Sequence, residues 1–176
     1  IFYMSNYKEK LQPITTMIFD FDGVLTDGKV LVINENEQLR SANVKDGYAL
    51  QYAVKSGYRV CVISGGKSVS MSQRLASLGI KDVFLGVDKK IDVFRKYVND
   101  NNLDKSEILY MGDDIPDYEI MNNVGVACCP ADAAIEIKSI SDYISDMKGG
   151  EGCVRDIIEQ VMRLHDKWFK DDAFHW

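Results

Sequence analysis

The sequence has no apolar run of about 18 residues, so no membrane-spanning helix is expected. Its first eleven residues mix charged and aromatic side chains and lack the apolar core of a signal peptide. The chain has only two histidines and no C-x-x-C pair, which argues against a zinc site. Buried free thiols in a reducing compartment are the expected state of the cysteines. These are Cys61, Cys128, Cys129 and Cys153.

Basic residues are also in the minority, with 21 Lys and Arg against 27 Asp and Glu, giving a formal charge of −6. That balance argues against a nucleic-acid partner, which usually requires a basic surface. It leaves a phosphate ester open as substrate, because a bound divalent cation can reverse the local field. A chain of 176 residues without repeats or linkers predicts one domain over residues 1–176.

Apolar runs alternate with segments of helical period, which predicts an α/β fold with helices on both faces of a mainly parallel sheet. Two short runs, Val30–Ile33 and Gln38–Ala42, flank Asn34-Glu35-Asn36-Glu37 and predict a β-hairpin within about residues 28–42. The predicted sheet strands are Thr15–Phe19, Arg59–Ile63, Asp82–Leu85, Ile108–Met111, Val124–Cys128 and Tyr143–Ile144. The predicted helices are Gly47–Ser56, Ser68–Leu78, Ile91–Asn101 and Val154–Phe169.

Two carboxylates, Asp20 and Asp22, follow the first predicted strand directly. Ligands in open α/β sheets bind at the carboxyl ends of the strands. Gly23 permits the chain to turn there. One carboxylate could then attack an electrophile while the other transfers protons.

Matching chemistry follows the other strands. The second parallel strand ends in Ser64-Gly65-Gly66 at a helix start, where free N–H groups suit an anion. The pair Lys89-Lys90 opens the next helix. The fourth parallel strand ends in Gly112-Asp113-Asp114, with Asp117 close by in sequence. Together they offer carboxylates for Mg²⁺, which prefers oxygen ligands, and a hydroxyl and a lysine for phosphate oxygens.

Each of these elements alone is commonplace: a turn, a solvated lysine or an N-cap pair. Their joint order resembles the haloacid dehalogenase superfamily, through Asp20-x-Asp22-Gly-x-x-Thr26, Ser64, Lys90 and Gly112-Asp113-Asp114-x-x-Asp117. The resemblance implies a Mg²⁺-dependent phosphatase. In it Asp20 is the nucleophile, Asp22 the general acid and base, and Ser64 and Lys90 hold the phosphoryl group. Mg²⁺ is bound by Asp20, the backbone carbonyl of Asp22 and Asp113, while Asp114 and Asp117 orient the metal's surroundings or Lys90.

The intervals after the first and second parallel strands are too short for the cap domain that many members insert. A neighbouring subunit could cover the site instead, and the apolar hairpin is a plausible interface. Three stretches resemble, within that superfamily, the capless tetrameric 3-deoxy-D-manno-octulosonate 8-phosphate (KDO 8-phosphate) phosphatases. In that family a glycine-rich C-terminal segment, here within residues 149–176, reaches a neighbour's active site. The three stretches are Asn43–Tyr48, Gly65–Ser68 and Gly149–Asp156.

The family's substrate is a small phosphorylated sugar acid, whose carboxylate lies far from its phosphate. Lys67 and Arg74 match basic family positions and could bind that carboxylate or the sugar hydroxyls. Gly65, Gly66, Asp27 and Asn43 are further candidates for substrate contact. Gly66 departs from the family, in which many relatives carry Arg and some carry Glu.

This departure leaves a nine-carbon keto-deoxy acid 9-phosphate as an alternative substrate. A receiver domain that keeps phosphate on Asp20 as a switch, and a non-catalytic oligomerisation module, are alternatives of another class. The second carboxylate, Asp22, argues against the receiver domain, because an acid and base there promotes hydrolysis. The intact Asp20, Asp22, Ser64, Lys90 and Asp113 argue against the non-catalytic module. The resemblance also implies a homotetramer in the cytoplasm of a Gram-negative bacterium, where the product serves lipopolysaccharide synthesis.

Overall fold

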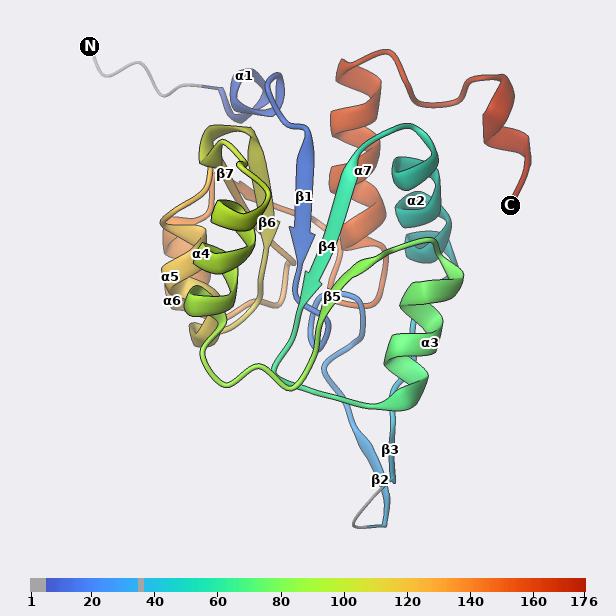
Figure 1. The fold of residues 1–176 in the computed structure, drawn as a ribbon, viewed down its shortest axis with the longest axis vertical. Helices are drawn as coiled ribbons and strands as arrows, with labels where there is room; N and C mark the ends of the chain where they lie inside the picture. The colour runs from blue at the N-terminus through green and yellow to red at the C-terminus, as the bar shows by residue number, and fades with distance from the viewer. Residues whose placement is uncertain (1–5, 35–36) are drawn as a thin grey trace.

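The computed structural model describes residues 6–34 and 37–176, leaving aside the side chain of Glu37. Residues 35 and 36, in the expected turn of the hairpin, lie outside the described part. A six-stranded sheet, in the order β5-β4-β1-β6-β7-β8, forms the centre of the molecule (Figure 1). Every strand pair in it is parallel, as the alternating sequence pattern predicts. The strands are β1 (Thr16–Phe19), β4 (Arg59–Ile63), β5 (Asp82–Phe84), β6 (Ile108–Met111), β7 (Val126–Cys129) and β8 (Tyr143–Ile144).

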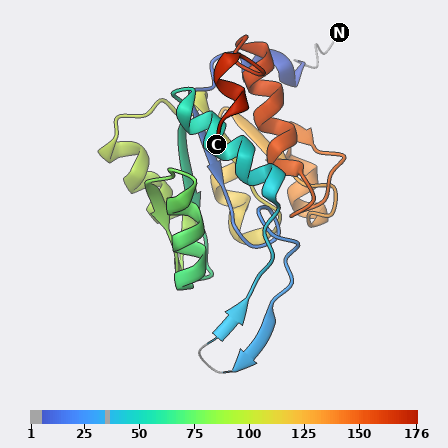
Figure 2. The same ribbon diagram turned by 90° about the vertical axis from the view of Figure 1, so that its right-hand side faces the viewer.

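Helices cover both faces of this sheet, which completes three layers (Figures 1 and 2). One apolar core lies between the sheet and α2 (Val44–Lys55), α3 (Val69–Ser77) and α7 (Cys153–Leu164). The other lies beneath α4 (Lys90–Asp100), α5 (Tyr118–Met121) and α6 (Ile135–Ile140). Burial on both faces explains the continuous apolar runs of the central strands. A short helix, α1 (Tyr7–Leu11), precedes β1, and 3₁₀ turns span Lys105–Glu107, Ile115–Asp117 and Asp171–Phe174.

The hairpin of β2 (Leu31–Asn34) and β3 (Glu37–Leu39) projects from the carboxyl end of the sheet (Figures 1 and 2). It pairs only with itself in the described residues. Leu31, Val32 and Ile33 are each at least half exposed. The expected second strand, Gln38–Ala42, is observed one residue earlier and shorter, because the chain leaves the ladder after Leu39 and leads into α2.

The C-terminal helix differs most from expectation. It was predicted over Val154–Phe169 but α7 ends at Leu164. Asp166 adopts a left-handed φ of 54°, and the N–H groups of Lys167 and Trp168 both turn back to the carbonyl of Met162. This reversal buries Trp168 against Tyr52. The last residues therefore pack over α2, at the end of the sheet opposite the hairpin (Figure 1).

Candidate active site

The carboxyl end of β1 leads straight into the pair of carboxylates. β1 ends at Phe19, and Asp20 is buried directly after it. The turn then runs through Gly23, whose φ of +86° favours glycine. Buried Thr26 holds this turn by accepting N–H groups from Gly23 and Gly28 at 3.3 and 3.2 Å. The Asp-x-Asp-Gly-x-x-Thr spacing thus makes a loop in which the terminal threonine fixes the turn.

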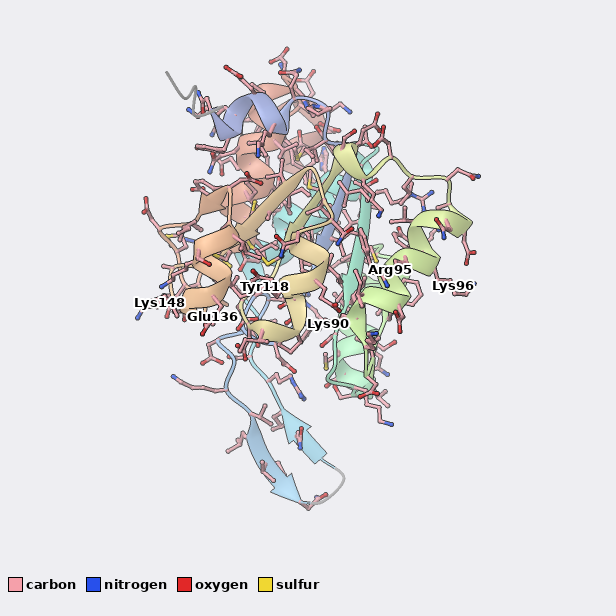
Figure 3. All side chains as sticks on the ribbon, turned by 90° about the vertical axis from the view of Figure 1, so that its left-hand side faces the viewer. Lys90, Arg95, Lys96, Tyr118, Glu136 and Lys148 are labelled. Carbon is pink, nitrogen blue, oxygen red and sulfur yellow. The ribbon has the colours of Figure 1, made fainter. Side chains whose placement is uncertain are left out.

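Lys90 and Ser64 reach the same point from neighbouring elements. Lys90, the first residue of α4, places its Nζ 2.9 Å from Oδ1 of Asp20. It projects near the end of the sheet from which the hairpin leaves (Figure 3). Ser64 follows β4 and is buried, with Oγ accepting the N–H of Gly66 at 3.2 Å. A cation and a hydroxyl therefore lie beside the predicted nucleophile.

Asp117 is the most fully bonded of the acidic residues. Its Oδ1 accepts from Lys90 Nζ at 2.7 Å and from the Tyr110 hydroxyl at 2.5 Å. Its Oδ2 accepts the N–H groups of Asp113 and Asp114 at 3.2 and 3.5 Å. With its oxygens engaged in this way, Asp117 is suited to orient Lys90 and the loop after β6, the role predicted from the sequence. Tyr110 has no part in the sequence motifs, although it was identifiable as an apolar residue of the strand.

Crowding of these groups raises several pKa values. Burial, and then the nearby Asp117, raise the pKa of Asp20 to about 7, although Lys90 opposes them. Burial and the charge of Asp20 raise the pKa of Asp113 to about 8. Burial alone would lower the pKa of Lys90, but Asp117 and Asp20 raise it. The protein thus holds more negative charge here than its single lysine offsets.

This excess of carboxylates fits a hard divalent cation. One oxygen from each of Asp20, Asp113 and Asp117 lies within 4.8 Å of the others. Carboxylate oxygens are the donor type that Mg²⁺ prefers. Asp117 is bonded to Lys90 and Tyr110, which leaves Asp20 and Asp113 as the two of the three that can hold the ion. Gly23 has no side chain at the place where a Cβ would overlap the Asp113 carboxylate, so the loop after β1 can approach that carboxylate closely. Mg²⁺ is therefore the cofactor that these residues suit.

Two connected hollows open at this end of the sheet. We call the first, of about 460 Å³, the catalytic cavity; it contains Asp20, Asp22, Ser64, Lys90 and Asp113. Asp114 and Asp117 also line it. The second, which we call the hairpin groove, has about 1060 Å³ and lies between β3 and the start of α3. Gly65 and Gly66 line both hollows, so the groove leads away from the catalytic cavity.

The remaining predicted substrate contacts are divided between the groove and other places. Lys67 lines the hairpin groove. Arg74 instead points to α2, where its Nη2 occupies the space in which a Cβ of Gly47 would lie. Asn43 caps α2, accepting the Lys45 N–H at 2.8 Å, and Asp27 pairs with Lys29 at 3.7 Å. Arg74, Asn43 and Asp27 are not among the described residues that line either hollow.

Sequence reasoning missed Arg40, which follows β3. Its Nε donates to Oδ1 of Asp22 at 2.6 Å, and the Arg40 side chain is only 8 % exposed. A Cβ on Gly66 would lie 2.5 Å from Oδ2 of Asp22 and 3.2 Å from Nη2 of Arg40. Glycine at position 66, where relatives carry Arg or Glu, thus has a structural explanation. The Asp22–Arg40 pair occupies the space that a side chain there would need. No motif signals Arg40, since its approach depends on how the chain leaves the hairpin.

The glycine-rich segment before α7 packs against the loop that carries the carboxylates. A Cβ on Gly149 would overlap the carbonyl oxygen of Gly23. Gly150 donates its N–H to the carbonyl of Val24 at 3.0 Å. The segment therefore supports the loop after β1 from within the same chain.

Comparisons with known proteins agree with this geometry. A family model described as haloacid dehalogenase-like hydrolase matches residues 83–157. The KDO 8-phosphate phosphatase KdsC of Salmonella typhi is 32 % identical over 158 residues, covering 90 % of this chain and 84 % of the relative.

Two solved structures are also similar. A KDO 8-phosphate phosphatase from Yersinia pestis has a TM-score of 0.89 and 28 % identity, covering 93 % of this chain and 88 % of that chain. The Moraxella catarrhalis enzyme, in complex with magnesium, phosphate and KDO, has a TM-score of 0.90 and 28 % identity. That comparison covers 98 % of this chain and 97 % of the other.

The parallel sheet with clustered carboxylates at its carboxyl end is that of a haloacid dehalogenase-like hydrolase, a phosphatase class that uses Mg²⁺. Within this class the chain belongs to the family of the KDO 8-phosphate phosphatases. Among the described residues no helix is long and apolar enough to cross a bilayer.

Proposed function

We propose that this chain hydrolyses KDO 8-phosphate to KDO and phosphate through an aspartyl-phosphate on Asp20. The observation that carries the proposal is the buried contact of Lys90 Nζ with Asp20 Oδ1 at 2.9 Å, beside Asp22, Ser64 and Asp113 in one cavity. The named relatives support the sugar acid, since they share both the family and the arrangement of the fold.

In the first step a carboxylate oxygen of Asp20 attacks phosphorus, and the bond from phosphorus to the sugar oxygen breaks. Asp22 gives its proton to that oxygen as the sugar leaves. Lys90 and the Ser64 hydroxyl bind the equatorial phosphoryl oxygens, where negative charge is spread in the transition state. Lys90 is held in place for this by Asp117.

In the second step water attacks the phosphorus of the aspartyl-phosphate. Asp22, now ionised, takes a proton from that water, and the bond between phosphorus and the Asp20 oxygen breaks. Phosphate leaves and both carboxylates return to their starting states. Asp20, Asp113 and the backbone carbonyl of Asp22 would hold Mg²⁺, which would supply positive charge to the phosphoryl oxygens.

The proposal includes a homotetramer in which a neighbouring subunit closes the site. The hairpin supports it, because Leu31, Val32, Ile33 and Leu39 are exposed at 44–65 % and have no apolar partner layer in the described chain. Substrate hydrolysis benefits from such closure, since exclusion of water strengthens the electrostatics of the cavity. The proposal locates this reaction in the cytoplasm, within lipopolysaccharide precursor synthesis. Sedimentation of the purified protein measures its assembly, and a monomer would remove the subunit part of the proposal.

The test is Mg²⁺-dependent phosphate release from KDO 8-phosphate, a nine-carbon keto-deoxy acid 9-phosphate and hexose phosphates. Preference for KDO 8-phosphate, lost in Asp20→Asn and kept in the exposed control Asp100→Asn, is the expected result. Preference for the nine-carbon acid would retain the chemistry and replace the substrate. A stable acyl-phosphate with no turnover would identify a phosphate switch instead.

A further inference from the structure

We propose that Arg40 binds the carboxylate of the sugar acid and so determines which phosphate esters this phosphatase accepts. The inference rests on the function proposed above and adds a residue that the sequence motifs do not contain. It starts from the guanidinium of Arg40, which lies where the hairpin groove meets the catalytic cavity.

Arg40 has donors to spare. Only its Nε edge is used, by Oδ1 of Asp22 at 2.6 Å. Its Nη1 is buried without a hydrogen-bond partner in the described part of the chain. A buried cationic donor left unpaired is costly, so such a group calls for a partner. The Nη1–Nη2 edge of a guanidinium matches a carboxylate bidentately.

The bare Cα of Gly66 lets the guanidinium of Arg40 lie close to the backbone where the two hollows meet. Nη2 of Arg40 lies 3.2 Å from the point that a Cβ at position 66 would occupy. Gly66 lines both hollows, so a substrate that places its phosphate beside Asp20 and extends into the groove runs along this backbone, next to the guanidinium of Arg40. The backbone of Gly66 has no left-handed φ, so its lack of a side chain matters for space.

The charge of the groove selects an anion. Its described lining includes two cations, Arg40 and Lys67, and no carboxylate. The catalytic cavity next to it contains six aspartates and one lysine. Arg40 shares its charge with Asp22 and Lys67 adds a second cation, so the lining of this groove is more positive than the rest of a chain of net charge −6 and suits the carboxylate of a sugar acid.

The experiment follows hydrolysis of p-nitrophenyl phosphate, which has no carboxylate, and uses KDO and inorganic phosphate as competitive inhibitors. In Arg40→Gln we expect the inhibition constant of KDO to rise at least about 10-fold, while that of phosphate stays within about 3-fold. Arg40→Lys keeps the charge but cannot bind a carboxylate bidentately. Its inhibition constant for KDO should lie between those of Arg40→Gln and the native protein. Arg95→Gln is the matched control, because the Arg95 side chain is exposed on the surface of α4 (Figure 3), and it should change neither constant.

Equal changes in both constants, or an unchanged constant for KDO, would overturn the proposal. Melting curves of the variants identify any that fail to fold, and Arg40→Lys then carries the comparison. Turnover of KDO 8-phosphate by the native protein is measured separately. Absence of this turnover would refute the proposed function. An inhibition constant of KDO that is the same in the Arg40 variants and the native protein would refute only the role of Arg40.

Discussion

The Tyr110 hydroxyl donates to Oδ1 of Asp117 over 2.5 Å at the base of the catalytic cavity, and both side chains are fully buried. Burial, together with the charges of Asp117 and Asp20, raises the pKa of Tyr110 well above its ordinary value, so the hydroxyl remains a donor. The tyrosine thereby supports the carboxylate that in turn holds Lys90 against Asp20.

Tyr110→Phe removes only this hydroxyl. We expect the free energy of unfolding to fall by about 1–3 kcal/mol, because a buried charged acceptor loses a donor. Denaturant unfolding measures the loss. Tyr118→Phe is the control, since Tyr118 is exposed on α5 (Figure 3). Equal stability of Tyr110→Phe and the native protein would show that the bond contributes nothing.

Gly66→Ala tests the space around Asp22. The new Cβ would press on Oδ2 of Asp22, so we expect kcat to fall by about 10- to 100-fold through misplacement of this proposed general acid. Gly65→Ala is a matched neighbour, where a Cβ meets only the Val87 carbonyl at an ordinary 3.5 Å. Steady-state kinetics should separate the two variants. Similar kcat values in both would contradict the importance of the Asp22 position.

Asp22→Asn should separate the two chemical steps. With p-nitrophenyl phosphate as substrate, the leaving p-nitrophenolate needs no proton, so the aspartyl-phosphate still forms in the variant. Water is no longer activated, so hydrolysis of the aspartyl-phosphate slows. We expect steady turnover to fall by about 10²–10⁴-fold. A burst of nitrophenolate close to one per active site should precede it, measured by stopped flow. A steady rate without a burst would contradict this prediction, because it would mean that the loss of Asp22 does not slow the second step selectively.

Mg²⁺ should stabilise the fold, because it neutralises carboxylates that repel one another. At 100 times its dissociation constant the expected gain is about 2.7 kcal/mol. Melting curves with Mg²⁺ and with EDTA measure this difference, and activity should disappear with EDTA. Asp113→Asn should remove most of the Mg²⁺ effect, while the exposed Asp100→Asn should retain it. An unchanged melting response in Asp113→Asn would place the ion elsewhere.

Asp46 should give stability an unusual pH dependence. Burial raises its pKa from 3.8 to about 6, against opposing bonds from the Arg155 and Gly152 backbone. The folded state therefore binds this proton more tightly, and its contribution to stability is lost as pH rises from about 4 through 6. We compare the free energy of unfolding of Asp46→Asn with that of the native protein. This difference should shift in favour of the variant by roughly 1–3 kcal/mol between pH 4 and pH 8.

The measurement for Asp46 is unfolding of both proteins at several pH values. Asp100→Asn serves as a carboxylate control, because the Asp100 side chain is exposed on the surface of α4. A difference between Asp46→Asn and the native protein that does not vary with pH would contradict the raised pKa.

The candidate site residues at the carboxyl ends of strands could be predicted from the sequence. Asp20 and Ser64 follow apolar strands directly, Asp113 follows one after a single glycine, and parallel strands bring their carboxyl ends to one edge. Arg40 could not be found in this way, because its position depends on the exit of a hairpin whose direction has no periodic signal. Arg74 had the expected residue type, yet its helix turns it toward Gly47.

Element boundaries followed a similar division. The central strands were predicted within two residues, since burial on both faces makes them continuously apolar. The end of α7 was not, because the left-handed turn at Asp166 stabilises the contact of Trp168 with α2, a long-range effect. Short helices α5 and α6 are too brief for a helical period to be recognised.

The contact of Gly149 with the carbonyl of Gly23 has a consequence for genetics. A mutational scan scored for activity should find position 149 as intolerant as Asp20, the proposed nucleophile, although the two residues are 129 positions apart in the chain. Any side chain there would displace the loop after β1. Substitutions or insertions at this position should therefore lower activity through the loop that carries Asp20 and Asp22, while the two apolar cores stay intact.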